Sequence, residues 1–287
     1  MSAMQIGKFE VIGPLGTGAH STILQIRRKS DSKTYALKVV PIDGPEDMKF
    51  YDQAEHELRV AGMLNHPNLL QAHALEKVRN WIFRVKKVHL LIEYVNGKTL
   101  DTVGPIPLPH LVQIFVQVAE GLNHMHRQGV FHADLKPNNI ILSKANQAKI
   151  IDYGLAWIRG EGKGRIQGTP EYMAPEQSKH KMVNERTDMY NFGAALYRML
   201  TFRHPPATVS LEDGGIPVDG KMWKRMFTPV QEHNATAPEE LCSLVHQCLS
   251  YNARKRPETM SEIQGKLDRI ADDLKQSSDD ELENFEW

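Results

Sequence analysis

The sequence predicts an α+β fold in which a strand-rich region is followed by a mainly helical one. The first hundred residues hold apolar runs typical of strands, separated by glycines and by turn residues such as SDSK at 30–33. From Leu108 onward, longer segments have apolar residues at helical spacing. The pattern changes at about residues 93–104, so we expect two regions that meet near this segment.

Within the strand-rich region we expect five strands and one helix. Each strand is an apolar run bounded by turn residues, and the helix has Pro45 near its start, where proline is tolerated. The expected strands are 8–18, 21–29, 34–42, 68–78 and 88–95, and the expected helix is 45–65.

The second region contains several candidate helices and an acidic end. The first of these helices has Pro109 near its start and Gly129 at its end. The expected helices are 108–129, 185–201, 238–250 and 258–276. The last sixteen residues, from Asp272, hold seven acids against one lysine. We expect the end of this stretch to be a solvated tail, and the alternative is an acidic peptide that binds a partner.

Length and composition are those of an ordinary globular protein. The 287 residues can bury a substantial core, and the 41% hydrophobic and 24% charged residues are usual values. The 35 basic and 35 acidic residues cancel, so no bulk charge favours nucleic acid or a membrane as the main partner. The first residues resemble no targeting peptide, and no apolar run approaches the roughly 18 residues of a membrane span. We therefore expect a cytoplasmic protein without a nucleic-acid partner or a membrane span.

The two cysteines, Cys242 and Cys248, lie six residues apart in the expected helix 238–250. This separation in a helix directs the two side chains well apart, and Cys248 shares one helix face with apolar residues. We expect free, buried thiols rather than a disulfide, which suits a reducing compartment.

Two glycines, Gly16 and Gly18, lie at the end of the first expected strand, just before the second. Glycines let a backbone fold closely over phosphates, although a plain hairpin is the simpler explanation of this pair alone. The next strand favours phosphate binding over a plain hairpin, because Lys38 lies among apolar residues at a position where its ammonium could reach such phosphates. Glu57 on the following helix is our choice for the acid that holds Lys38, and the alternative is two unrelated surface charges.

The segment VFHADLKPNNIIL at 130–142 places an acid, a lysine and an asparagine within six residues. With this segment, the chain resembles the eukaryotic-like (Hanks-type) Ser/Thr protein kinases. The motifs that carry the resemblance are, in order, GTGAHS, YALK, Glu57, LIEYV, HADLKPNN, DYG, GTPEYMAPE, TDMYNFG and RKRP. Each could arise by chance, but their order and spacing are typical of this family.

The resemblance implies a two-lobed protein-kinase fold over residues 8–270. The β-rich N-lobe would span about 8–95 with one main helix, and the helical C-lobe about 96–270. Residues 271–287 would form the acidic tail. The implied activity is transfer of the γ-phosphoryl group of ATP, with Mg²⁺, to Ser or Thr hydroxyls of a protein substrate.

The resemblance also implies individual roles in the reaction. Asp134 would accept or orient the proton of the substrate hydroxyl, and Lys136 would neutralise charge at the γ-phosphate. Asn139 and Asp152 would hold magnesium, which favours oxygen ligands. The implied ATP-binding residues are Leu15, Gly16, Gly18, Ile23, Ala36, Lys38, Glu57, Glu93, Val95 and Ile141.

Four further residues would support the site. Asp188 would accept hydrogen bonds from backbone N–H groups of the catalytic segment. Glu176 and Arg256 would form a buried ion pair, and Thr169 would help to orient Asp134 and Lys136 through its hydroxyl.

Three positions depart from the family pattern. Ser21 replaces the third loop glycine and tolerates fewer backbone conformations. Tyr153 replaces a phenylalanine, so its hydroxyl needs a partner if it is buried. Ala133 replaces an arginine that in many kinases pairs with an activating phosphate, which makes this a non-RD variant.

The segment 157–168 agrees with the change at Ala133, because it contains no Ser, Thr or Tyr that could carry such a phosphate. We therefore expect a kinase that does not require activation-loop phosphorylation. The alternatives are a pseudokinase scaffold and, with less support, a small-molecule phosphotransferase. Three basic residues hint at acidic acceptor peptides: Lys163, Arg165 and Lys179.

Overall fold

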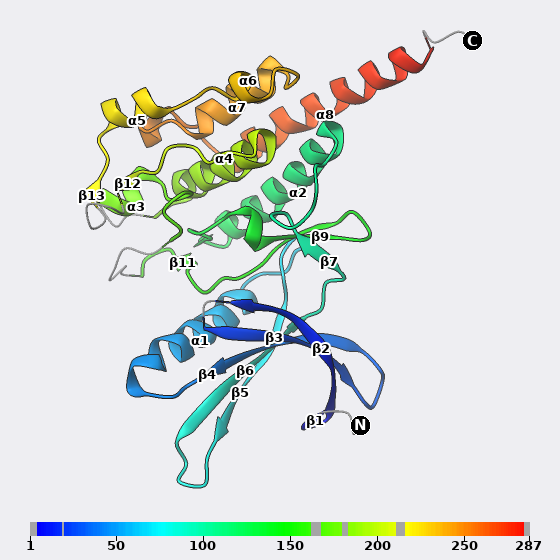
Figure 1. Cartoon of the computed structure of the whole chain (residues 1–287), viewed down its shortest axis with the longest axis vertical. Coiled ribbons are helices and arrows are strands. Elements are labelled where there is room, and N and C mark those ends of the chain that lie inside the picture. Colours follow the sequence, from blue (N-terminus) through cyan, green and yellow to red (C-terminus); the bar gives the residue numbers. More distant parts are fainter. Residues whose placement is uncertain (1–4, 19, 162–167, 180–182, 211–215, 284–287) are drawn as a thin grey trace. The chain divides into compact units, whose positions relative to one another are not determined.

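The structure is a computed structural model that describes residues 5–18, 20–161, 168–179, 183–210 and 216–283. It divides into two compact units (Figure 1). The strand-rich unit comprises Met1–Asn65, Leu69–Asn96 and Asp152–Gly154, and the helical unit comprises His66–Asn68, Gly97–Ile151 and Leu155–Trp287. Asp152 therefore belongs to the strand-rich unit, although the chain reaches it only after a long passage through the helical unit.

An antiparallel six-stranded sheet forms most of the strand-rich unit, in the order β1-β2-β3-β4-β6-β5. Its strands are β1 Gln5–Ile6, β2 Phe9–Gly18, β3 Ser21–Arg28, β4 Thr34–Pro41, β5 Ala72–Arg79 and β6 Val85–Glu93. Ile26, Tyr35 and Leu37 of the central strands form one buried cluster. Branched and aromatic side chains favour this pleated, half-buried setting.

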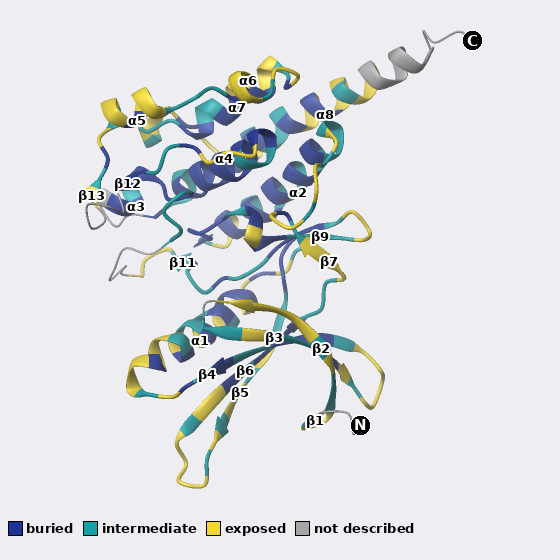
Figure 2. Ribbon diagram, viewed as in Figure 1, coloured by how far each residue is buried: buried dark blue, intermediate teal, exposed yellow. Residues whose placement is uncertain are grey.

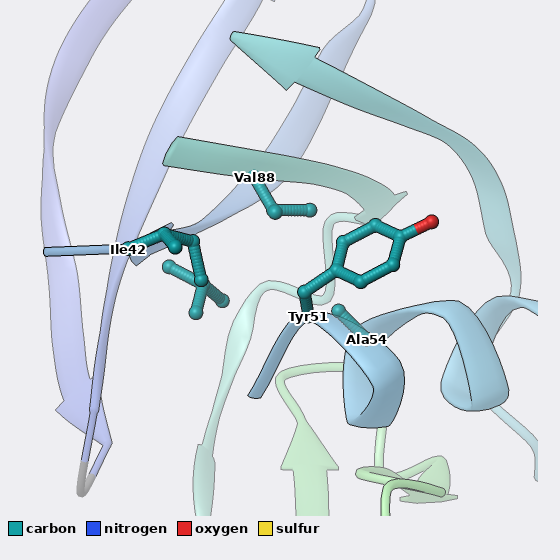
Figure 3. Packing of buried hydrophobic residues seen from close by; sticks show 5 residues of the cluster. Ile42, Tyr51, Ala54 and Val88 are labelled. Carbon is teal, nitrogen blue, oxygen red and sulfur yellow. The ribbon is translucent and has the colours of Figure 1, made fainter. Parts of the chain in front are cut away.

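The helix α1 (Met48–Gly62) supplies a second buried cluster to this unit. Figure 3 shows its Tyr51 and Ala54 against Ile42 and Val88. These helical residues are three apart and so lie on one face, which the helix turns toward the sheet.

The helix begins later than the expected Pro45, because Pro45–Asp47 form a 3-10 turn. The Asp47 carboxylate accepts the N–H groups of Asp43 and Gly44 at 2.9 and 3.1 Å, which fixes this tighter turn.

Helices dominate the helical unit. Their bounds are α2 Leu108–Arg127, α3 Pro175–Lys179, α4 Glu185–Thr201, α5 Gly220–Met226, α6 Val230–His233, α7 Glu239–Cys248 and α8 Met260–Glu283. Short strands accompany them: β7 Gly97–Thr99, β9 Ile140–Ser143 and β10 Ala148–Ile150 form one sheet, β8 Val130–Phe131 pairs with β11 Trp157–Ile158, and β12 Val209–Ser210 pairs with β13 Ile216–Pro217.

The core of the helical unit lies where α2, α4 and α7 pack together. The rings of Phe115 and Phe192 meet edge to face, with centroids 5.3 Å apart. Gly193 lets α7 approach α4 closely, since a Cβ there would lie 2.6 Å from the Cβ of Cys248. Cys242 and Cys248 are free and buried, which confirms the expected thiols, and burial raises the pKa of Cys248 to about 12.

The predicted α+β fold class is confirmed, with the six-stranded sheet and α1 in one unit and the helices α2 to α8 in the other. Helix α8 runs to Glu283 instead of ending near 276, because neither glycine nor proline follows Gly265 to stop it. Of the helices in the described residues, none combines the length and the apolar character that a membrane crossing requires.

Candidate active site

The end of strand β2, next to the turn to β3, carries the two glycines singled out from the sequence. The residues from Pro14 to Gly18 are exposed, so the backbone of this end of the strand is accessible. Gly18 pairs with Ser21 across the hairpin. A Cβ at Gly18 would lie 2.7 Å from the Ser21 Oγ, so the serine occupies the space that a side chain at Gly18 would need.

A contact that sequence reasoning missed ties this turn to helix α1. The His20 ring stacks on the Phe50 ring with centroids 3.9 Å apart and an interplanar angle of 19°. The His20 Nε2 also lies 3.5 Å from the Asp47 carboxylate. The only sequence signal was the aromatic ring of His20 between Gly18 and Ser21, which does not by itself indicate a partner.

Lys38 and Glu57 form an ion pair inside the strand-rich unit. The Lys38 Nζ donates to the Glu57 Oε2 at 2.7 Å, and the Glu57 side chain is 3% exposed. The same ammonium lies 3.5 Å from the Asp152 carboxylate. Burial alone would lower the pKa of Lys38, but the two carboxylates outweigh it and raise that pKa, so the ammonium stays charged.

Residues expected around adenine lie on several strands. Ile23 pairs with Lys38 across β3 and β4, and Ala36 is buried on β4. The Glu93 N–H donates to the Gln71 C=O at 2.9 Å, so this N–H is already occupied. Two others are half-buried: Val95 follows β6, and Ile141 lies on β9 of the helical unit. Leu15 is exposed and lies on β2, next to Gly16.

A carboxylate, an ammonium and a hydroxyl meet in the helical unit. The Asp134 Oδ1 accepts both the N–H and the hydroxyl of Thr169 at 2.8 Å. The Lys136 Nζ lies 3.0 Å from the Asp134 Oδ2 and donates to the Thr169 Oγ1 at 2.5 Å. Thr169 therefore joins the two charged side chains.

Asn139 completes this group from the 3-10 turn Pro137–Asn139. Its Nδ2 donates to the Asp134 C=O at 2.9 Å and to the Asp134 Oδ2 at 3.3 Å. The Ile151 N–H donates to the Asn139 C=O at 2.9 Å. The side chains of Asp134 and Asn139 are thus oriented by protein contacts alone.

The buried Asp188 holds the backbone of the same segment. Its carboxylate accepts the N–H groups of His132 at 2.9 Å and Ala133 at 2.8 Å, and it lies 2.8 Å from the His126 Nε2. Burial alone would raise the pKa of Asp188, but the bonds to His126 and Ala133 and the histidine charges outweigh it and lower that pKa.

Ala133 has a left-handed backbone, with φ 63°, and is buried. Besides the bond to Asp188, its C=O accepts from the Gln177 Nε2 at 2.8 Å. Its methyl group lies in an apolar cluster with Phe131, Val183 and the partly buried Trp157. Apolar packing therefore surrounds the position where an arginine would be expected.

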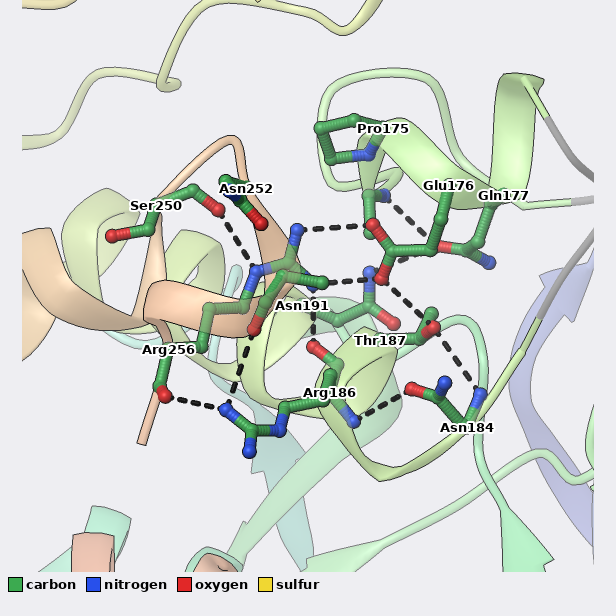
Figure 4. A network of polar contacts seen from close by, with 12 residues as sticks. Pro175, Glu176, Gln177, Asn184, Arg186, Thr187, Asn191, Ser250, Asn252 and Arg256 are labelled. Atoms are coloured by element: carbon green, nitrogen blue, oxygen red, sulfur yellow. Dashed lines mark hydrogen bonds and ion pairs between the residues drawn. The ribbon is translucent and has the colours of Figure 1, made fainter. Parts of the chain in front are cut away.

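Glu176 and Arg256 anchor α3 to the turn before α8 (Figure 4). The two terminal nitrogens of Arg256 donate to the two Glu176 oxygens at 2.7 and 3.0 Å. Arg256 also donates to the C=O groups of Ser250 and Arg186, and its side chain is 0% exposed. The Thr187 hydroxyl donates to Glu176 at 3.0 Å.

The remaining positions have simpler surroundings. The Tyr153 ring is buried, and its hydroxyl donates to the Leu70 C=O at 3.2 Å, so the extra polar atom has a partner. Lys163 and Arg165 lie outside the described residues, as does the side chain of Lys179. The described residues contain no group of three or more His, Cys, Asp or Glu side chains that could hold a metal ion.

Comparisons with known proteins give a consistent result. A family model described as protein kinase domain matches residues 9–266. The chain is 28% identical to the serine/threonine-protein kinase PknB of Mycobacterium leprae over 272 residues, which cover 92% of this chain and 43% of that protein. It is 29% identical to the serine/threonine-protein kinase pkn2 of Myxococcus xanthus, over 90% of this chain and 32% of that protein. The chain thus spans less than half the length of these relatives.

Proposed function

Because the chain belongs to the protein kinase family, we propose that it transfers the γ-phosphoryl group of ATP to serine or threonine hydroxyls of protein substrates. The observation that carries this proposal is the contact group of Asp134, Lys136 and Thr169. It sets a proton acceptor beside a fixed positive charge, which phosphoryl transfer to a hydroxyl requires. The names of the relatives support Ser or Thr as the acceptor.

In this proposal Asp134 orients the acceptor hydroxyl and takes its proton as the new O–P bond forms and the bond from the γ-phosphorus to the β–γ bridging oxygen breaks, with ADP as the leaving group. Thr169 holds one oxygen of this carboxylate, and Lys136 and Asn139 lie against the other. Lys136 also stabilises the negative charge of the transferred phosphoryl group. Catalysis then rests on positioning and charge, as a loose transition state allows.

The nucleotide is assigned to the ATP-binding residues that the resemblance to kinases implies. Leu15, Gly16 and Gly18 would lie along the phosphates, whose oxygens the exposed backbone can approach. Lys38, held by Glu57, would bind the α- and β-phosphates. Adenine is assigned to Ile23, Ala36, Val95, Ile141 and the backbone of Glu93; the occupied Glu93 N–H requires that another backbone atom there make the contact.

Magnesium is assigned to Asn139 and Asp152. The donor chemistry fits, since both side chains offer oxygen and the Asp152 carboxylate is 43% exposed. The Asn139 amide is oriented by its bonds to Asp134. When bound with ATP, the ion would offset phosphate charge, while these two side chains fix its position.

We also propose that activity does not require a phosphate on the activation segment. Ala133 supplies no cation to receive one, and an apolar cluster surrounds it. The start of the segment is held without phosphate: the Trp157 ring stacks on Phe131, and Arg159 pairs with Glu185. Phosphatase-treated protein should keep its activity, and a loss of activity that mass spectrometry assigns to the removal of phosphate from Thr169 or a neighbouring residue would contradict this.

The remaining assignments complete the proposal. The kinase domain would span 8–270, with lobes at about 8–95 and 96–270, and the acidic stretch 271–287 would be the place for a protein partner. A cytoplasmic location is in keeping with the free thiols of Cys242 and Cys248.

A transfer assay with Mg-ATP and a generic protein substrate tests the main proposal. Asp134→Asn should lower transfer by about 10²- to 10⁴-fold, because it removes the proton acceptor. Asp268→Asn, an exposed change on α8, is the matched control. Binding of a fluorescent ATP analogue should persist in Asp134→Asn.

The same assay separates the two alternatives. Equal background transfer by wild type and Asp134→Asn, with nucleotide binding intact, would favour a pseudokinase scaffold. Transfer to small hydroxyl compounds in preference to peptides would favour a small-molecule phosphotransferase. Preference for basic over acidic peptides would contradict the expectation that the acceptor peptides are acidic.

A further inference from the structure

The hairpin between β5 and β6 ends in three exposed apolar residues. Trp81 is 88% exposed, Phe83 79% and Ile82 44%. Figure 1 shows this hairpin, in cyan, projecting beyond the other strands of its sheet, and Figure 2 shows its end in the colour of exposed residues. Single exposed apolar residues are ordinary, but three in a row mark a contact surface. We call residues 81–83 the apolar tip.

The backbone of the apolar tip is held in place from within. The Asn80 Oδ1 accepts the N–H groups of Ile82 at 3.1 Å and Arg84 at 2.9 Å. The Asn80 N–H donates to the Arg84 C=O at 2.9 Å, and Arg79 donates to the Phe83 C=O at 2.8 Å. The hairpin therefore presents its apolar side chains from a fixed turn.

Phe83 stands in a conformation that suits glycine better. Its φ is 60°, in the left-handed region that bulky residues seldom adopt. Packing within the protein does little to offset the cost of this backbone conformation, because the Phe83 ring is largely exposed. An aromatic ring kept at such a position points to a contact outside the chain.

Basic residues flank the apolar tip on both strands. Residues 77–87 contain five cations and no acid, although the whole chain has equal numbers of both. These five residues, all exposed, are Lys77, Arg79, Arg84, Lys86 and Lys87. Lys77 lies 3.5 Å from the Glu55 carboxylate, and Glu76 lies just outside the range, so Arg79, Arg84, Lys86 and Lys87 supply the positive charge around the apolar tip.

We propose that this hairpin docks onto the surface of an anionic lipid bilayer. Tryptophan and other apolar side chains insert at the level of the lipid headgroups, and clustered Lys and Arg bind anionic lipids. The contact is with the surface of the bilayer, and the chain does not cross it. The proposal rests only on the strand-rich unit and is independent of the kinase reaction.

Co-sedimentation with lipid vesicles tests this proposal. Wild-type protein should bind vesicles with about one third phosphatidylserine far better than vesicles of phosphatidylcholine alone. Raising the salt from about 0.1 M to about 1 M should weaken this binding, because the charge attraction is screened. Failure of the wild type to bind the anionic vesicles would overturn the proposal, whether or not it captures an acidic protein or RNA.

Variants assign the binding to the hairpin. Trp81→Ser with Phe83→Ser should lower vesicle affinity by about a hundredfold, through loss of two buried aromatic rings. Lys86→Glu with Lys87→Glu should lower it by about tenfold or more. The matched controls lie on α5, where Met222→Ser with Met226→Ser and Lys224→Glu with Arg225→Glu should bind as the wild type does. Equal binding by the hairpin variants would overturn the assignment.

Phe83→Gly separates binding from stability. Glycine suits the left-handed backbone, so the melting temperature should stay or rise while vesicle affinity falls severalfold. Unchanged affinity in this variant would show that the ring makes no contact with lipid. Transfer to a soluble acceptor should be the same in all hairpin variants, so failure here is distinct from failure of the proposed reaction.

Discussion

Two buried ion pairs, one in each unit, have opposite surroundings. In the strand-rich unit, Lys38 and Glu57 share one hydrogen bond of 2.7 Å, and the nearby Asp152 carboxylate is 3.5 Å from the ammonium. In the helical unit, Arg256 makes a two-pronged contact with Glu176 and donates to two backbone C=O groups as well. The arginine is thus largely satisfied by the protein, and the lysine contacts carboxylates alone.

This difference indicates different tasks for similar charges. A guanidinium with fixed partners on several elements stabilises the fold, and its loss leaves the Glu176 carboxylate without a cation, with the Thr187 hydroxyl as its remaining side-chain donor among the described contacts. An ammonium held by a single strong contact keeps its charge and can still face a ligand. Loss of the first pair should therefore reduce stability, and loss of the second should reduce activity and, at a pH where Glu57 is ionised, stability as well.

The largest effect should come from Arg256→Ala. We expect the free energy of unfolding to fall by about 3–5 kcal/mol, because the largely buried Glu176 carboxylate loses its cation and the buried C=O groups lose their donor. Urea or thermal unfolding measures this change. Arg254→Ala, an exposed change in the same turn, is the control and should have little effect. A melting curve like that of the wild type would remove the contrast between the two pairs.

Lys38→Met should lower phosphoryl transfer by about 10²- to 10³-fold, since the positive charge at the phosphates is lost. The exposed Lys29→Met is the control. Transfer at the wild-type rate would show that Lys38 has no part in the reaction.

The stability of Lys38→Met should also depend on pH. Burial raises the pKa of Glu57, and Lys38 opposes that rise. Without Lys38 this pKa rises further, so the folded state binds a proton that the unfolded state has released. Stability relative to the wild type should then fall as pH rises from about 5 to about 8. Parallel curves for the two proteins would contradict this coupling.

Thr169→Val tests whether a contact within the candidate site affects activity, as we expect for Lys38 and Glu57, more than stability. It removes the hydroxyl that joins Asp134 and Lys136, so kcat should fall by about 10- to 100-fold while stability changes little. Thr169→Ser keeps the hydroxyl and should restore most of the rate. A large loss of stability in the valine variant would instead group Thr169 with the structural contacts.

Tyr153→Phe should have the smallest effect. It removes the bond to the Leu70 C=O and should cost about 1 kcal/mol of stability with little change in transfer. Chemical unfolding measures the loss. A gain in stability would show that the hydroxyl is a poor fit in the strand-rich unit.

The sequence predicted the long elements of the fold and missed the short ones. The helix α2 and the strands β3 and β4 are long enough for their apolar residues to show a clear helical or strand periodicity. Strands of two residues, such as β8 and β11, are too short to show one. The apolar tip was missed for a different reason, because it lies between the expected strands 68–78 and 88–95, in a segment to which no element was assigned.

Proximity within the candidate site was predictable only in part. Asp134, Lys136 and Asn139 are near one another along the chain, so their contacts follow from a single segment. Thr169 lies far along the chain, and only the resemblance to kinases placed it beside Asp134. The left-handed backbone of Ala133 had no sequence signal, because bonds from distant residues impose it.

The close approach of α7 to α4 at Gly193 provides a natural probe of motion. The Cys248 thiol is buried at this contact, and its pKa of about 12 keeps it protonated at neutral pH. An alkylating reagent can reach and trap it only when the two helices separate. The rate of that labelling would therefore report how often the helical unit opens, with no need to introduce a cysteine.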